Sequence, residues 1–154
     1  MIAVFTIIVF IIDIISKIII TKYIGLGKSI KVIDDFIYLT YVRNTGAAWS
    51  MLDNSRYFVL IISAIIIVGL IMYIYKNKPN NKIEKLAYGF ILGGALGNFI
   101  NRCISGYVTD FIDIKIFAFD YPIFNLADVF IVIGVIIFGV YTWRYSDGNK
   151  SKRK

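Results

Sequence analysis

The sequence predicts a mainly α-helical integral membrane protein, in which four helices form a bundle with a small β-sheet region at one membrane surface. Two observations predict this class. The 154 residues are 58% hydrophobic with a mean hydropathy of +0.74, more than a soluble domain of this length buries. Four stretches are also long enough to cross a hydrocarbon core, which takes about 20 helical residues. We therefore expect residues 1–154 to form a single membrane domain, because the length leaves no room for a second one.

The apolar stretches predict membrane spans at residues 2–20, 57–75, 86–104 and 125–143. The first contains Asp13 and Lys17 and lacks the basic start and the small-residue cleavage site of a signal peptide, so we expect it to be retained. The second carries no charge and has tyrosines at both ends, as in an interfacial aromatic belt. The third is rich in glycine, and the fourth contains only Asp128 as a charge.

The distribution of Lys and Arg predicts the orientation of the bundle, because cytoplasmic flanks gather basic residues. Residues 76–85 contain four basic residues in ten and residues 144–154 contain five in eleven, whereas residues 21–56 spread five over thirty-six. We expect both termini to be cytoplasmic, with residues 21–56 and 105–124 extracytoplasmic. These flanks also account for the net charge of +7, so membrane phospholipids are expected as partners and nucleic acid is not.

Two extracytoplasmic segments have the composition of β-strands. Residues 29–42 are rich in β-branched and aromatic residues and predict one or two short strands, and residues 107–119 are similar. Together they predict a small sheet over the outer membrane surface. The alternative is that both segments only connect helices, because short apolar runs are ambiguous.

The unusual polar residues of the spans are predicted to converge at the outer surface. They lie in the outer half of the first span, at the outer end of the third, at the outer start of the fourth and in the last connection: Asp13, Lys17, Asn98, Arg102, Asn125, Asp128 and Asp110. An ionisable residue within a membrane is costly unless it is paired or has a function. This convergence indicates a site.

The residue types present restrict the chemistry of that site. The chain has no histidine and one cysteine, which excludes Ser-His and Cys-His nucleophiles and imidazole zinc sites. Hydrolysis would therefore depend on carboxylates, and Asp110 and Asp128 are the candidate pair. Two carboxylates in a poorly solvated site share a proton, so that one acts as base and the other as acid. We expect no metal and no cofactor. Asp113, three positions after Asp110, is an alternative member of the pair.

Several of these features also have purely structural interpretations. Asp13 and Lys17 are four residues apart and would neutralise one another on a helix. Arg102 alone is typical of a basic side chain that reaches to the membrane interface. Glycines at every fourth position give the third span a smooth packing face: Gly89, Gly93 and Gly97.

Residues 44–50, Asn-Thr-Gly-Ala-Ala-Trp-Ser, place an amide beside a turn of small residues at the outer surface. Small residues such as Gly46 allow the backbone to approach another group closely. The alternative is a loop that re-enters the membrane interface with Trp49 as its anchor.

Five blocks of the sequence, in order and spacing, resemble the lipoprotein signal peptidases, also called signal peptidase II. The blocks are Asp13-Ile-Ile-Ser-Lys17, residues 44–50, Gly93-Gly-Ala-Leu-Gly-Asn98 with Arg102, Val108-Thr-Asp110-Phe-Ile, and Phe124-Asn-Leu-Ala-Asp128. The resemblance covers essentially the whole chain. It implies a catalytic dyad of Asp110 and Asp128, supported by Asp13, Lys17, Asn44, Gly46, Asn98, Arg102, Asn125 and Ala127.

The resemblance further implies a membrane aspartic endopeptidase that removes the signal peptide from diacylglyceryl-modified bacterial prolipoproteins, cleaving before the lipidated cysteine. It implies a monomer in the bacterial cytoplasmic membrane with its active site at the extracytoplasmic face. The chain departs from the family at Asn101, where an acidic residue usually precedes the arginine, so we expect Arg102 to be oriented less firmly. Trp49, where phenylalanine is common, is a milder departure.

Two other classes of function remain open from the residues. A proton or ion carrier would use Asp13, Lys17, Asp110 and Asp128 as a relay, although no polar residues continue a path through the cytoplasmic halves of the spans. A non-catalytic assembly subunit would need the aspartates only for packing.

Overall fold

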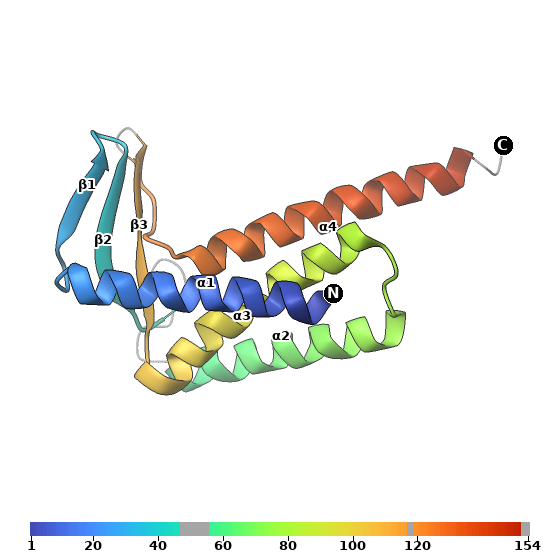
Figure 1. Ribbon diagram of the computed structural model, residues 1–154, viewed down its shortest axis with the longest axis horizontal. Coiled ribbons are helices and arrows are strands. Elements are labelled where there is room, and N and C mark those ends of the chain that lie inside the picture. The colour runs from blue at the N-terminus through green and yellow to red at the C-terminus, as the bar shows by residue number, and fades with distance from the viewer. Residues whose placement is uncertain (47–55, 117–118, 152–154) are drawn as a thin grey trace.

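The computed structural model describes residues 1–46, 56–116 and 119–151 (Figure 1). Within these residues the chain forms four helices and four strands, in the order α1 (Ile2–Tyr23), β1 (Ser29–Ile33), β2 (Ile37–Asn44), α2 (Arg56–Asn77), α3 (Lys82–Ser105), β3 (Val108–Ile116), β4 (Phe119–Asp120) and α4 (Leu126–Ser151). The predicted class, mainly α with a small sheet, is confirmed. Each helix contains nearly all of one predicted span and extends beyond it.

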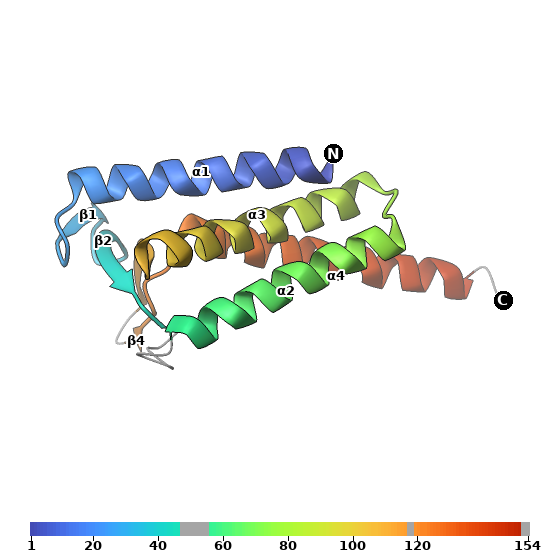
Figure 2. The same cartoon turned by 90° about the horizontal axis from the view of Figure 1, so that it is seen from below.

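Three helices of the described chain, α1, α2 and α4, are long and apolar enough to cross a membrane. Their outward side chains remain uncovered, as Ile65 and Met72 of α2 show with 65% exposure each, and lipid is the environment that such a surface requires. The helix α3 is not among the three, and it contacts α1, α2 and α4 (Figure 2). Because neighbouring helices cover α3, its surface is made for close packing rather than for lipid. That all four helices cross the membrane stays a prediction.

Glycines bring the axes of α1, α3 and α4 close together. The predicted packing face of α3 lies against α1, at Gly89, Gly93 and Gly97. A Cβ atom on Gly97 would collide with the carboxylate of Asp13, and one on Gly94 would collide with the backbone carbonyl of Ala127 in α4. The prediction of a close-packing face is therefore confirmed, and the close approach lets polar side chains of three helices meet.

The strands form one antiparallel sheet in the order β1-β2-β3-β4. Residues 29–42 thus contain two paired strands, and the alternative that these segments only connect helices is wrong. Val42 of β2 lies opposite Asp110 of β3 in the register. Beneath the sheet, Ile20 and Ile24 pack with Tyr41 and Phe111 in a buried core.

The sheet lies at one end of the bundle, where α1 ends and α4 begins (Figure 1). The start of α1, the end of α4 and the connection between α2 and α3 lie at the opposite end (Figures 1 and 2). This arrangement has the parity that the predicted orientation requires, and it gathers the sheet and three helix ends around the candidate site.

Candidate active site

Asp110 lies on β3, outside the helices, and only 2% of its surface is exposed. Both of its carboxylate oxygens accept hydrogen bonds from amide side chains, Oδ1 from Asn125 Nδ2 at 2.5 Å and Oδ2 from Asn44 Nδ2 at 2.8 Å. Burial raises the pKa of Asp110 to about 6, although the two amide hydrogen bonds act in the opposite direction. Asp110 is therefore a carboxyl group that can change its protonation state near neutral pH.

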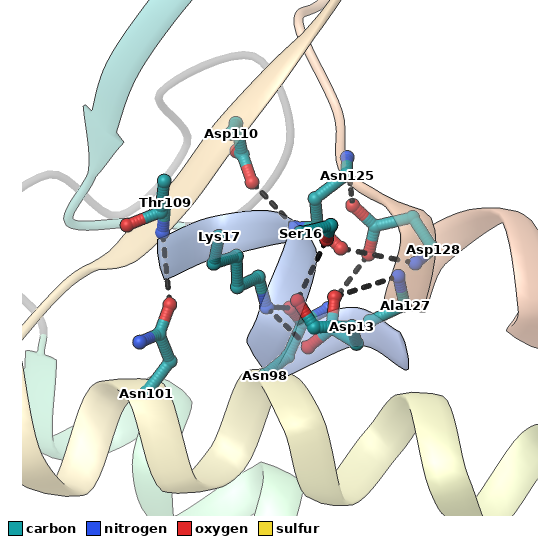
Figure 3. Close-up of polar contacts among 10 residues, drawn as sticks. All are labelled: Asp13, Ser16, Lys17, Asn98, Asn101, Thr109, Asp110, Asn125, Ala127 and Asp128. Atoms are coloured by element: carbon teal, nitrogen blue, oxygen red, sulfur yellow. Dashed lines mark hydrogen bonds and ion pairs between the residues drawn. The ribbon is translucent and has the colours of Figure 1, made fainter. Parts of the chain in front are cut away.

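Asp128 lies in the first turn of α4, where the helix dipole favours a negative charge. Its Oδ1 accepts a hydrogen bond from Asn98 Nδ2 at 2.7 Å, and its Oδ2 accepts one from the backbone N–H of Asn125 at 3.1 Å. Asn125 Oδ1 in turn accepts from the backbone N–H of Asp128 at 3.2 Å. Asn125 thus bonds both aspartates, and it brings the predicted pair Asp110 and Asp128 together (Figure 3).

Asp13 and Lys17 of α1 form a buried ion pair with 2.8 Å between Lys17 Nζ and Asp13 Oδ2. Lys17 Nζ also donates to Asn98 Oδ1 at 2.9 Å, and Asp13 Oδ1 accepts from the backbone N–H of Ala127 at 3.0 Å. The structural and functional interpretations of this pair are therefore compatible, because the two residues neutralise one another and also contact the residues around Asp128 (Figure 3).

Asn44 and Arg102 meet at Gly46, at the start of the segment of small residues. The backbone N–H of Gly46 donates to Asn44 Oδ1 at 3.1 Å, and Arg102 Nη2 donates to the carbonyl of Gly46 at 3.2 Å. Arg102 therefore connects the end of α3 to the loop that follows β2, which gives it more than the interface role considered above. The predicted Trp49 anchor lies outside the described residues.

Asn101 has a role that the sequence did not reveal. Its Oδ1 accepts a hydrogen bond from the backbone N–H of Thr109 at 3.0 Å (Figure 3). Thr109 is 3% exposed and directly precedes Asp110. Between the two, Gly106 ends α3 with a φ of 82°, in the left-handed region that favours glycine, and the chain turns back into β3. Asn101, at the position where the family usually has an acidic residue, thus joins α3 to the strand that carries Asp110.

Asp113, the alternative member of the pair, has different neighbours. Its Oδ2 accepts from Thr40 Oγ1 at 2.8 Å, and its Oδ1 lies 3.3 Å from Lys115 Nζ. Asp110 bonds the same asparagine as Asp128 does, so the geometry favours Asp110.

Fold and site together are those of a membrane enzyme with two carboxylates, of which Asp110 is buried and Asp128 is partly buried, held by one asparagine at one end of a helix bundle. Residues 5–144 match the family model described as signal peptidase (SPase) II, and the chain belongs to this family of peptidases.

The relatives agree with this assignment. The chain is 40% identical over 136 residues to the lipoprotein signal peptidase of Anoxybacillus flavithermus (strain DSM 21510 / WK1), a match that covers 88% of this chain and 81% of that protein. Two solved structures of bacterial membrane enzymes, obtained by the in meso method at 2.3 and 1.9 Å resolution, are also similar. The first has a TM-score of 0.85 and 38% identity over 94% of this chain and 88% of its own. The second has a TM-score of 0.81 and 40% identity over 90% of each chain. The protein is a bacterial membrane protein.

Proposed function

We propose that this protein is an aspartic endopeptidase that removes signal peptides from diacylglyceryl-modified bacterial prolipoproteins, cleaving before the lipidated cysteine. Membership of the signal peptidase II family and the relative's name support the substrate class. The observation that carries the aspartic mechanism is the position of Asn125, which bonds both Asp110 and Asp128.

In this mechanism the two aspartates share one proton. The ionised carboxylate takes a proton from water, whose oxygen attacks the scissile carbonyl. The protonated carboxyl group stabilises the developing oxyanion and then protonates the leaving amine. Asn125 keeps Asp110 and Asp128 together. The carboxylate oxygen of each aspartate that Asn125 does not bond accepts from Asn44 in Asp110 and from Asn98 in Asp128. Metals and organic cofactors have no part in this proposal.

We place the sheet end of the bundle at the extracytoplasmic face of the cytoplasmic membrane, with all four helices crossing and the protein acting as a monomer. The basic residues of segments 76–85 and 144–154 support this orientation. A site at the outer edge of the bilayer can receive a lipid-anchored peptide laterally. Each buried methylene of its acyl chains would contribute about 0.8 kcal/mol to binding.

The two rival functions account less well for the structure. An ion carrier needs polar groups along its whole path, but the buried charged and amide side chains of the described residues lie at the sheet end: Asp13, Lys17, Asp110, Asp113 and Asn125. An assembly subunit gives no reason for Asp110 and Asp128 to bond the same asparagine, because burial of a carboxylate such as that of Asp110 destabilises the fold unless the charge is used or paired.

The proposal is tested with purified protein in lipid nanodiscs and a diacylglyceryl-modified prolipoprotein. Mass spectrometry should find two products, a free signal peptide and a lipoprotein that begins with the lipidated cysteine. The same precursor without diacylglyceryl is the control and should be cut far more slowly. Cleavage at another bond, or equal cleavage of both precursors, contradicts the proposed substrate. Ion flux in proteoliposomes without any cleavage supports the carrier instead.

Asn44→Ala should move the pH profile of kcat/KM. The Asn44 amide stabilises the ionised form of Asp110, so its loss raises the pKa of Asp110 above about 6. The limb of the profile in which Asp110 titrates should shift to higher pH. Thr40→Ala is the matched control, because Thr40 bonds Asp113 and not the pair. A shift to lower pH, or equal shifts in both variants, would contradict this assignment.

Asn101→Ala should lower kcat about tenfold and leave KM nearly unchanged, because a buried N–H without its partner costs about 1–3 kcal/mol and displaces the strand that carries Asp110. Asn101→Asp should restore most of kcat, since a carboxylate oxygen also accepts from Thr109 N–H. The check is steady-state cleavage of the lipidated precursor by the three proteins. If both variants behave alike, Asn101 does not position Asp110.

A further inference from the structure

A cavity lies apart from the aspartate pair. Its volume is about 640 Å³, and it is lined by the C-terminal parts of α1 and α3, by β2 and by the start of β3. Neither Asp110 nor Asp128 lines it. The cavity lies at the sheet end of the helices, which the proposed orientation places at the membrane interface. It would therefore be surrounded by lipid headgroups and the first part of the acyl chains.

The polar side of this cavity carries a positively charged side chain, that of Arg43, whose position is restrained by its neighbours. The guanidinium of Arg43 lies over the ring of Tyr107, 4.7 Å from its centroid, and Arg43 Nε donates to the hydroxyl of Tyr41 at 3.2 Å. All three residues line the cavity. Stacking and hydrogen bonding restrict the side chain of Arg43, so less conformational entropy is lost when it binds an anion.

The charge of this cavity favours an anion. Its lining contains Lys17 and Arg43 but no acidic residue. Lys17 is neutralised by Asp13 at 2.8 Å. In the part of the chain that the structure describes, Arg43 belongs to none of the ion pairs, and its positive charge is left for a ligand. A planar guanidinium matches the oxygens of a phosphate.

The other side of the cavity is apolar. Ile18 of α1 and Ile104 of α3 line it and are 58% and 79% exposed. Water is a poor environment for such side chains, and an acyl chain that runs down between the helix ends would cover them. The cavity therefore presents a cation at its polar rim and an apolar wall below it, which is the amphipathic pattern of a phospholipid.

We propose that this cavity binds one anionic phospholipid, with the phosphate on Arg43 and an acyl chain along Ile18 and Ile104. Such binding needs no catalytic turnover, so it does not depend on the proposed peptidase function.

Native mass spectrometry of the purified protein tests this proposal, with phosphatidylglycerol or phosphatidylcholine added to the micelles. The wild type should retain one phosphatidylglycerol in preference to phosphatidylcholine. Arg43→Gln should reduce this retention about tenfold, as expected for the loss of a charge-assisted hydrogen bond. Thr21→Trp should abolish this retention, because Thr21 lines the cavity and a larger side chain fills it.

Lys31→Gln is the matched control, since this exposed lysine of β1 pairs with Asp34 at 2.7 Å and does not line the cavity. Its retention should equal that of the wild type.

Equal retention of both lipids by the wild type would overturn the proposal, and so would unchanged retention in Arg43→Gln or Thr21→Trp. The diacylglyceryl group of a substrate is the competing occupant. If lipidated precursor displaces the phosphatidylglycerol one for one, and Arg43→Gln raises the KM for that precursor, the cavity belongs to the substrate and the proposal is wrong. If retained phosphatidylglycerol and precursor bind together, the proposal stands.

Discussion

Asp110→Asn and Asp128→Asn should each lower kcat for the lipidated precursor by at least about a thousandfold, because each removes one of the two groups that exchange protons with the reacting atoms. An amide also presents an N–H₂ group where the site supplies donors, since Asn44 and Asn125 both donate to Asp110. Each variant should therefore lose one hydrogen bond as well as its chemistry. Single-turnover cleavage measures the first effect, and the thermal unfolding temperature measures the second.

The matched control is Asp113→Asn, which makes the same chemical change on the same strand. Asp113 bonds Thr40 and Lys115 rather than Asn125, so this variant should keep nearly wild-type turnover. The double variant of Asp110 and Asp128 should be no slower than either single one, because members of one catalytic unit are not additive. Inactivation by Asp113→Asn with normal turnover by Asp110→Asn would transfer the catalytic role to Asp113.

The helices were predictable because every helical turn that faces lipid requires apolar side chains. Exposed apolar residues such as Ile65 in α2 and Val132 in α4 carry this pattern. The predicted fourth span, residues 125–143, agrees with the apolar part of α4, Leu126–Arg144. The hydropathy pattern does not mark the end of the helix itself, which continues to Ser151, because the backbone hydrogen bonds of a helix do not require apolar side chains.

The aspartate pair was predictable from the blocks that contain Asp110 and Asp128, but some of the contacts that position the site were not. Backbone N–H groups of Ala127 and Thr109 donate to Asp13 and Asn101, and nearly every residue has such a donor. The residue types therefore carry no signal for these two contacts, although the family resemblance placed Ala127 among the supporting residues. Asn101 was interpreted as a lost partner of Arg102, yet its side chain bonds the backbone that leads to Asp110.

Lys17→Met should destabilise the protein by about 3–5 kcal/mol, the usual cost of leaving one member of a buried ion pair without its partner. Asp13 is fully buried, and its remaining described partner would be the backbone N–H of Ala127. The substitution also removes the donor to Asn98, which bonds Asp128. Activity should therefore fall together with stability. The measurement is the free energy of unfolding in detergent micelles, with cleavage of the precursor in parallel.

A double substitution separates charge from packing. Adding Asp13→Asn to Lys17→Met removes the uncompensated charge, while the amide oxygen can still accept from Ala127 N–H, so the double variant should be more stable than Lys17→Met alone. Lys31→Met is the surface control. It breaks a pair whose side chains are 56% and 72% exposed, and such pairs contribute about 0–1 kcal/mol. If Lys17→Met lowers the free energy of unfolding no more than Lys31→Met does, then the Asp13–Lys17 pair does not join α1 to the site. The glycine face of α3 alone would then account for the packing of α1 on α3.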